Sequence, residues 1–117
     1  MAAPNIVNVT TIYGKTAVQA ITTSATAIIS NSSGSGQVLK VDTLLVANVN
    51  GTSNATVNAD VYRSSTAYRF AYQITVPAGA TLDILNKYIY LEEGDSIRLT
   101  ASSNSYLEAV ASYEQIS

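Results

Sequence analysis

Apolar and polar residues alternate with a period of two along most of the chain, which is typical of strands that bury one face and expose the other. Residues 55–62, ATVNADVY, and 68–76, YRFAYQITV, show the alternation most clearly. A short polar break, RSST, separates them, so the two runs predict a hairpin. The inward side chains expected for the second run are Tyr68, Phe70, Tyr72, Ile74 and Val76.

Further runs rich in β-branched residues predict more strands, and turn-forming residues separate them. These runs cover residues 6–13, 17–21, 26–30, 37–49, 81–85, 88–91, 96–101 and 107–113. No segment has convincing helical periodicity, although the alanine-rich residues 15–30 leave one helical turn open. The pattern predicts an all-β fold: an antiparallel β-sandwich of about eight strands, jelly-roll or Greek-key-like, or else a small barrel.

Residues 37–49, QVLKVDTLLVANV, are apolar on both faces of the predicted strand. One face carries Leu39, Val41, Leu45 and Ala47, and the other carries Val38, Leu44 and Val46. A strand with two apolar faces is usually central in its sheet or buried against a partner. We therefore predict that Val38, Leu44 and Val46 lie in a partner or oligomer interface.

The length of 117 residues predicts a single β-sandwich domain over residues 1–117, because a second core would not fit. Within it, residues 1–8 are expected to form an extended N-terminal arm. Pro4 keeps the start of this arm out of a strand ladder. Ile6 and Val7 are therefore predicted to contact a neighbouring subunit by strand addition.

Few side chains carry charge: 12% of the residues do, against about 25% in an ordinary soluble domain. The six basic residues are scattered, so no nucleic-acid partner is predicted, since phosphate binding needs clustered Lys and Arg. No apolar run approaches the roughly 18 residues of a membrane span, so no membrane contact is predicted. The N-terminus lacks the pattern of a signal peptide, and we expect synthesis in a cytosol.

The chain contains neither cysteine nor histidine. Disulfides, thiolate chemistry and Ser-His nucleophiles are therefore excluded. Without clustered metal ligands or a glycine-rich phosphate loop, the sequence predicts no cofactor, no metal site and no enzymatic activity.

The stretch LEEGDSIRLTA, residues 91–101, places three carboxylates close to an arginine. Glu92 and Glu93 are adjacent and would point to opposite faces of a strand, so they cannot act together on one bond. The Gly-Asp dipeptide that follows is typical of a turn. We predict a hairpin corner with solvated charges, in which Arg98 pairs with a carboxylate across the strands. A calcium-binding corner and a carboxylate pair for acid–base chemistry are the alternatives.

Eight tyrosines supply the aromatic side chains that a binding surface would use. Aromatic rings stack on sugars as well as on proteins, which leaves a carbohydrate-binding surface as an alternative. Tyr68 and Tyr72 fall on the inward phase of their strand and are predicted to lie in the core. The residues of this region predicted to face a partner or another subunit are Tyr62, Arg63, Arg69, Tyr88 and Tyr90.

Four stretches of the sequence resemble a family of small virion structural proteins of tailed phages, notably marine and cyanobacterial phages. They are DVYRSSTAYRFAY, VPAGATLDIL, IYLEEGDSIRLTAS and LEAVASYEQIS. The resemblance runs from about Thr10 to the C-terminus, and VYRSSTAY and YLEEGDSIR are its most specific parts.

The resemblance implies a β-sandwich without catalytic residues. It points to a capsid decoration or cement protein that binds the lattice of the major capsid protein and stabilises the head. It further implies a homo-oligomer, with a trimer favoured, on the capsid surface of a virion assembled in the host cytoplasm. Weak contacts to a repeating lattice add up by multivalency, which suits a sparsely charged surface. Two alternatives stay open: a tail, neck or fibre component of the virion, and a free carbohydrate-binding adhesion module.

Overall fold

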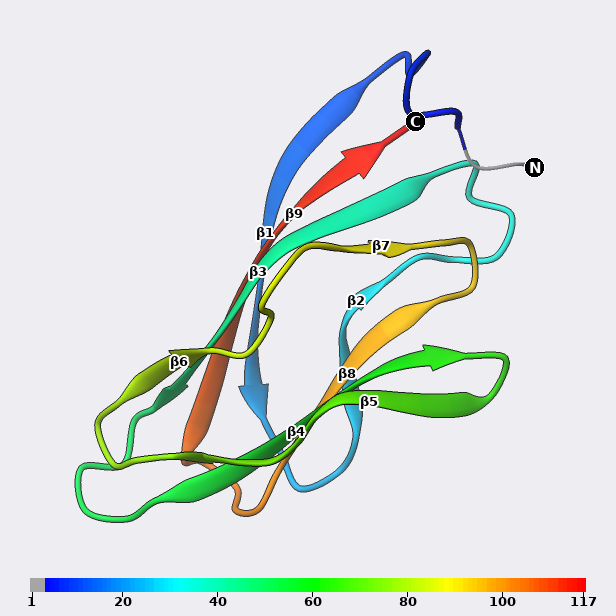
Figure 1. Ribbon diagram of the computed structural model, residues 1–117. Helices are drawn as coiled ribbons and strands as arrows, with labels where there is room; N and C mark the ends of the chain where they lie inside the picture. The colour runs from blue at the N-terminus through cyan, green and yellow to red at the C-terminus, as the bar shows by residue number, and fades with distance from the viewer. Residues whose placement is uncertain (1–3) are drawn as a thin grey trace.

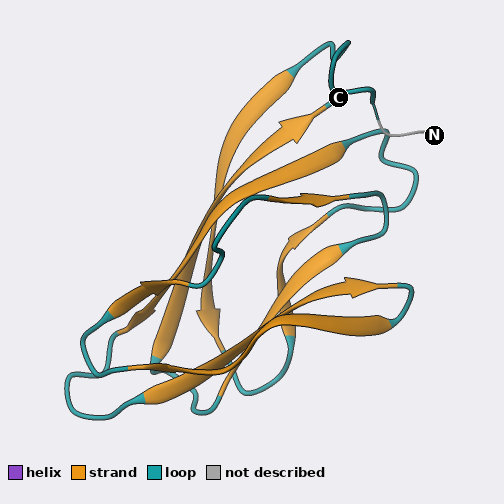
Figure 2. Cartoon of the chain, viewed as in Figure 1, coloured by secondary structure: helices purple, strands orange, loops and turns teal. Residues whose placement is uncertain are grey.

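The computed structural model describes residues 4–117, which form nine β-strands and no helix. The strands are β1 (Ile12–Ile21), β2 (Thr26–Ser30), β3 (Val38–Asn48), β4 (Ala55–Arg63), β5 (Thr66–Val76), β6 (Thr81–Asp83), β7 (Ile89–Leu91), β8 (Ser96–Ala101) and β9 (Leu107–Ile116). Within these described residues, no helix is long and apolar enough to cross a membrane. Figure 2 shows strands joined by turns and loops throughout.

Two antiparallel sheets lie one over the other (Figure 1). Sheet A has the order β1-β9-β3-β6, and β7 also pairs with β3. Sheet B has the order β2-β8-β4-β5. The strand β3 is the hub of sheet A, because it pairs with β9 on one side and with both β6 and β7 on the other. This arrangement confirms the predicted antiparallel β-sandwich.

A bulge in β3 explains why this strand looked apolar on both faces. The register against β9 shifts between Val41 and Thr43, and the extra residue reverses the alternation. Leu39 and Val41 before the bulge, and Leu44 and Val46 after it, therefore all face the core. The prediction placed these four side chains on two different faces of the strand. That assignment was wrong, because all four share one inner face.

The strands β4 and β8 supply the opposite wall of the core. Ala55, Val57 and Ala59 alternate inward along β4, as the sequence predicted, and Ile97 and Leu99 do the same along β8. These side chains are almost entirely shielded from solvent. Burial of such apolar area is the main favourable term in the stability of a domain this small.

The burial predicted for β5 fails at three positions. Tyr68 and Tyr72 are 61% and 57% exposed, and Ile74 is also exposed, whereas Val76 is buried and Phe70 packs partly against the core. Tyr68 and Ile74 pair with the inward-facing Val61 and Val57, so they keep the predicted phase and are exposed because β5 is the edge strand of sheet B. Tyr72 lies in the register shift between Ala71 and Ile74, where Gln73 adopts a positive φ of 50° and donates its backbone N–H to Asn58 Oδ1 at 2.6 Å.

The predicted β4–β5 hairpin is confirmed, and its turn uses two serines. Ser64 and Ser65 both have positive φ, 52° and 61°. Two-residue hairpin loops favour this left-handed conformation because its twist matches that of the flanking strands. Serine adopts it less readily than the Asn-Gly pair that usually marks such turns.

The strand expected at residues 6–13 begins later, at Ile12. Residues 5–8 instead form a turn, in which the Asn8 N–H bonds to the Asn5 carbonyl at 2.9 Å. Ile6 and Val7 are exposed in this turn. The first three residues of the predicted arm lie outside the described part of the chain.

Two neighbouring leucines in β3 test the bulge. Leu44 is 0% exposed and Leu45 is 39% exposed. We expect Leu44→Ala to lower the free energy of unfolding by about 2–5 kcal/mol, because it leaves a cavity in the core. Leu45→Ala should cost about 1 kcal/mol or less. Urea denaturation of both variants measures this; equal losses, or a larger loss for Leu45, would contradict the observed phase.

Candidate partner-binding surface

The turn after β7 carries the acidic cluster noted in the sequence. It runs from Glu92 to Asp95, and the Asp95 N–H bonds to the Glu92 carbonyl at 3.0 Å. Gly94 has a φ of 91°, which strongly favours glycine. Because β7 belongs to sheet A and β8 to sheet B, the turn crosses between the layers. The turn prediction holds, but the two strands do not form a hairpin.

Asp95 is only 2% exposed, and Arg63 neutralises it. The Arg63 Nε donates to Asp95 Oδ1 at 2.7 Å, and its Nη2 bonds to Asp95 Oδ2 as well. The same Nη2 donates to Glu92 Oε2 at 2.9 Å. The prediction of solvated charges was therefore wrong for Asp95, and the pairing arginine is Arg63. Arg63 reaches the turn because it ends β4, which runs beside β8 in sheet B.

This contact shifts both titrating groups. The hydrogen bond from Arg63 holds the pKa of Asp95 below its ordinary value, and a backbone N–H from Glu92 adds to the effect while burial opposes it. The same pair raises the pKa of Arg63 above its ordinary value. Asp95 is thus a permanently ionised group near neutral pH, and its geometry is that of a structural clamp.

A neighbouring loop is fastened to the same turn. Glu93 Oε2 accepts the Gly36 N–H at 2.7 Å, and the buried Asn31 side chain donates to the carbonyls of Gln37 and Leu91. The Glu93 carboxylate thus accepts from a backbone donor and the Asn31 amide bonds to two backbone carbonyls, so this turn connects the two layers. Among the described residues, no group of three or more acidic side chains has a geometry that could hold a metal ion.

A second ion pair lies on the outer face of sheet B. Arg98 donates from Nε to Oδ1 of the buried Asp60 at 3.0 Å. The Tyr62 ring stacks on the guanidinium, with 3.9 Å between the Arg98 Cζ and the ring centroid. Arg98 therefore pairs with a carboxylate across the strands, as predicted, and that carboxylate belongs to Asp60 of β4. Tyr62 is committed to this stack.

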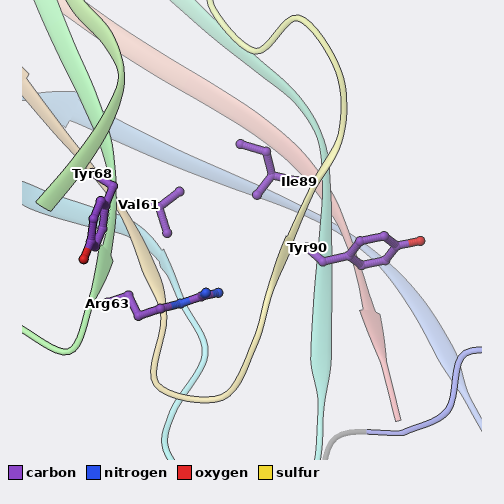
Figure 3. Close-up of a pocket in the computed structure, with 5 residues that line it drawn as sticks. All are labelled: Val61, Arg63, Tyr68, Ile89 and Tyr90. Atoms are coloured by element: carbon purple, nitrogen blue, oxygen red, sulfur yellow. The ribbon is translucent and has the colours of Figure 1, made fainter. Parts of the chain in front are cut away.

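An apolar pocket of about 360 Å³ opens between the sheets, where β7 faces β4 and β5. Figure 3 shows Val61 from β4 and Ile89 from β7 pointing toward each other across it, with Tyr68 on the side of β5. Arg63 also lines the pocket, and the Tyr90 ring points away from it. Its volume and apolar walls suit a side chain or two of a partner.

Aromatic side chains gather along the β5 and β7 edges that border this pocket. On β7 and just before it, Tyr90 and Tyr88 meet edge to face at 5.4 Å, and Lys40 Nζ lies 4.6 Å from the Tyr88 ring centroid. On β5, Arg69 lies 5.1 Å from the Tyr72 ring centroid. We call the surface formed by Lys40, Tyr68, Arg69, Tyr72, Tyr88 and Tyr90 the tyrosine edge.

The structure separates the predicted interface residues into four groups. Arg69 lies on the β5 side of the tyrosine edge and Tyr88 and Tyr90 on its β7 side, while Tyr62 and Arg63 are held in the two ion-pair clusters. Ile6 and Val7 are exposed at the N-terminal turn. Leu44 and Val46 follow the bulge and are core residues, and Val38 before the bulge is also buried, so none of the three lies on the accessible surface.

Sequence reasoning missed Tyr68, Tyr72 and Lys40 as members of this surface. Tyr68 has the inward phase that was predicted but lies on an edge strand, and Tyr72 was assigned to the core because the alternation of β5 was extended through a register shift. Lys40 gave no signal of its own, because it reaches Tyr88 only through the pairing of β3 with β7.

No family model matches the sequence, and no curated protein matches it. Two solved structures share the fold. A protein from the acid-stable capsid of Helicobacter pylori bacteriophage KHP30 superposes with a TM-score of 0.56 and 10% identity, covering 94% of this chain and 90% of that one. A subunit of the disulfide-linked pili that form Bacillus endospore appendages superposes with a TM-score of 0.53 and 12% identity, covering 92% and 88%. At these identities the likeness is one of fold.

Substitution of Asp95 tests the clamp. Its lowered pKa means that the ionised form stabilises the fold above the ordinary carboxyl pKa of about 4, and that this stabilisation is lost as the pH falls through the folded-state pKa. We expect Asp95→Asn to lower the free energy of unfolding by about 1–3 kcal/mol at neutral pH. The difference from the wild type should shrink on acidification, which urea titrations at several pH values measure.

Glu92→Gln is the matched control, because Glu92 contacts the same arginine but its side chain is 68% exposed. It should cost about 0.5 kcal/mol or less. A loss for Asp95→Asn that does not change with pH would contradict the assignment of the clamp to the ionised carboxylate.

Proposed function

We propose that the chain is a structural protein of a tailed-phage virion, a capsid decoration protein that binds the lattice of the major capsid protein and stabilises the head. Three findings support the proposal. The sequence resembles small virion structural proteins, the fold is similar to that of a phage capsid protein, and exposed tyrosines border an apolar pocket.

The observation that carries the proposal is the tyrosine edge. Protein interfaces are enriched in Tyr and Arg, which bury large areas with few rotatable bonds. Here Tyr68 and Tyr72 expose more than half of their surface, and the apolar pocket beside them can receive a side chain from the partner. Each copy would bind weakly, and repetition over the lattice would make the attachment stable.

A tail, neck or fibre component of the virion is the second candidate. The similarity in fold to a pilus subunit favours it, because pili are filaments. The chain itself has no cysteine, so a filament of this protein would have to hold together without the disulfides named for those pili. A carbohydrate-binding module is the third candidate. Sugars would then stack on the exposed tyrosines, which are the residues of the proposed contact with the lattice.

Copy number separates these functions. We expect quantitative mass spectrometry of purified virions to find on the order of hundreds of copies per particle, because a decoration protein follows the capsid lattice. About a dozen copies or fewer, as expected for a symmetric tail or neck ring, would overturn the decoration role and favour the second candidate.

Binding to the shell tests the surface. We expect Tyr68→Ala combined with Tyr72→Ala to reduce by about tenfold or more the fraction of protein that cosediments with shells lacking it. Val49→Ala, which truncates an exposed apolar side chain in the loop after β3, is the control and should bind like the wild type. Unchanged binding of the double variant would show that the tyrosine edge is not the contact.

A further inference from the structure

The strand β1 is the outer strand of sheet A, and nothing pairs with its free side within residues 4–117. It pairs with β9 over ten consecutive positions without a bulge. Figure 1 shows its first half projecting, together with β9, beyond the region covered by sheet B. Most of its residues are correspondingly exposed.

The hydrogen-bond phase of β1 follows from the pair just before it. Thr11 and Ser117 donate their N–H groups to each other's carbonyls, both at 2.9 Å, so they form a hydrogen-bonded pair. The register continues unbroken, so the odd-numbered residues of β1 bond to β9. The even-numbered residues point their N–H and C=O groups away from the sheet. They are Ile12, Gly14, Thr16, Val18 and Ala20, and all are exposed.

The other sheet edges are blunted. Strands β6 and β7 have three residues each, and β2 has five and a register shift. The long edge strand β5 has two register shifts and the left-handed Gln73. Such devices prevent edge-to-edge pairing, whereas β1 is long and free of register shifts. It has no proline and no bulge, and Lys15 is its one charged residue.

We propose that β1 is a self-association surface, which pairs antiparallel with β1 of a second copy about a two-fold axis. The axis passes beside Thr16, so Thr16 lies opposite Thr16 of the second copy. Gly14 then pairs with Val18 of the second copy. Ile12 pairs with its Ala20. In this register every outward N–H and C=O of the strand finds a partner, which makes sheet A continuous across two chains.

The sequence of β1 fixes the register of this pairing. Residues that pair across a two-fold axis must all point their N–H and C=O groups outward, and the five even-numbered residues do so. Shifting the register by two in one direction places Lys15 opposite Lys15 of the second copy, where like charges repel. Shifting it by two in the other direction leaves Ile12 without a strand residue to pair with.

Side chains fit the same register. Val18 projects from the outer face and would lie over Gly14 of the second copy, where an added Cβ would meet no atom within 4 Å. Val18 also continues a row with Val110 and Leu45, which are directly opposite across β9 and β3 and are both exposed. The pairing would bring two such apolar rows onto one continuous sheet.

This inference does not rest on the decoration role. It also differs from the trimer implied by the resemblance, because a two-fold pair closes on itself with two chains. The tyrosine edge lies on the opposite side of the sandwich, along β5 and β7, so both surfaces are accessible at once.

The mass in solution tests the proposal. Light scattering of the purified protein should give twice the 12.3 kDa of one chain, and Thr16→Pro should give a single chain. Proline at this position removes an outward N–H without removing a bond to β9. Thr16→Ala keeps the N–H and should stay a dimer. A wild-type monomer or trimer, or a folded Thr16→Pro dimer, would overturn the proposal.

The absence of native cysteine allows the register to be read directly. Thr16→Cys should form an intermolecular disulfide on mild oxidation, because paired Cα atoms lie about 5.5 Å apart. Gly14→Cys and Val18→Cys should not, because each lies about 13 Å from its own copy in this register. Crosslinking at either of these positions in place of position 16, or at none of the three, would contradict the proposal even if Thr16→Pro failed to fold.

Discussion

The pairing of backbone N–H and C=O groups at open sheet edges is the constraint on which the structure depends. Two sheets that do not close into a barrel have four edges, and unpaired polar groups along an edge attract another strand. Sheet A meets the constraint through β3, which pairs with three strands. Bulges and short strands shield most of the remaining edges, and β1 is left regular and open.

The bulges determine which side chains face the core or the solvent, and they also make the sheet edges irregular. The shift after Val41 turns Leu44 and Val46 into the core and makes one apolar wall of β3. A shift along β5 has the opposite effect, because it turns Tyr72 outward, whereas Tyr68 keeps the inward phase and lines the apolar pocket at the open edge. Bulges therefore complete the core on one sheet and shape the tyrosine edge on the other.

Much of the fold could be predicted from the alternation of residues. The sandwich, the β4–β5 hairpin and the bounds of β2 follow from period-two patterning and turn residues, because these signals are local. The bulges could not be predicted, since an extra residue leaves no clear mark in the sequence and reverses every assignment after it. The clamp between Arg63 and Asp95 was missed for a different reason. It joins residues 32 positions apart and requires knowledge of which strands are neighbours.

Under the proposed function, the two accessible edges would make different contacts. Self-pairing along β1 would present two tyrosine edges facing away from one axis, and a bivalent unit binds a repeating lattice far more tightly than one copy does. The clamp between the layers holds the β7–β8 turn, and with it one wall of the pocket, in a fixed position.

Amide hydrogen exchange measured residue by residue along β1 tests the central claim most directly. The amides of Lys15 and Ala17, which bond to β9, should exchange slowly at every protein concentration. Those of Thr16 and Val18 should exchange quickly in dilute solution and slowly once two copies pair. Fast exchange of Thr16 and Val18 at all concentrations would contradict the account, and so would slow exchange of both in the monomer.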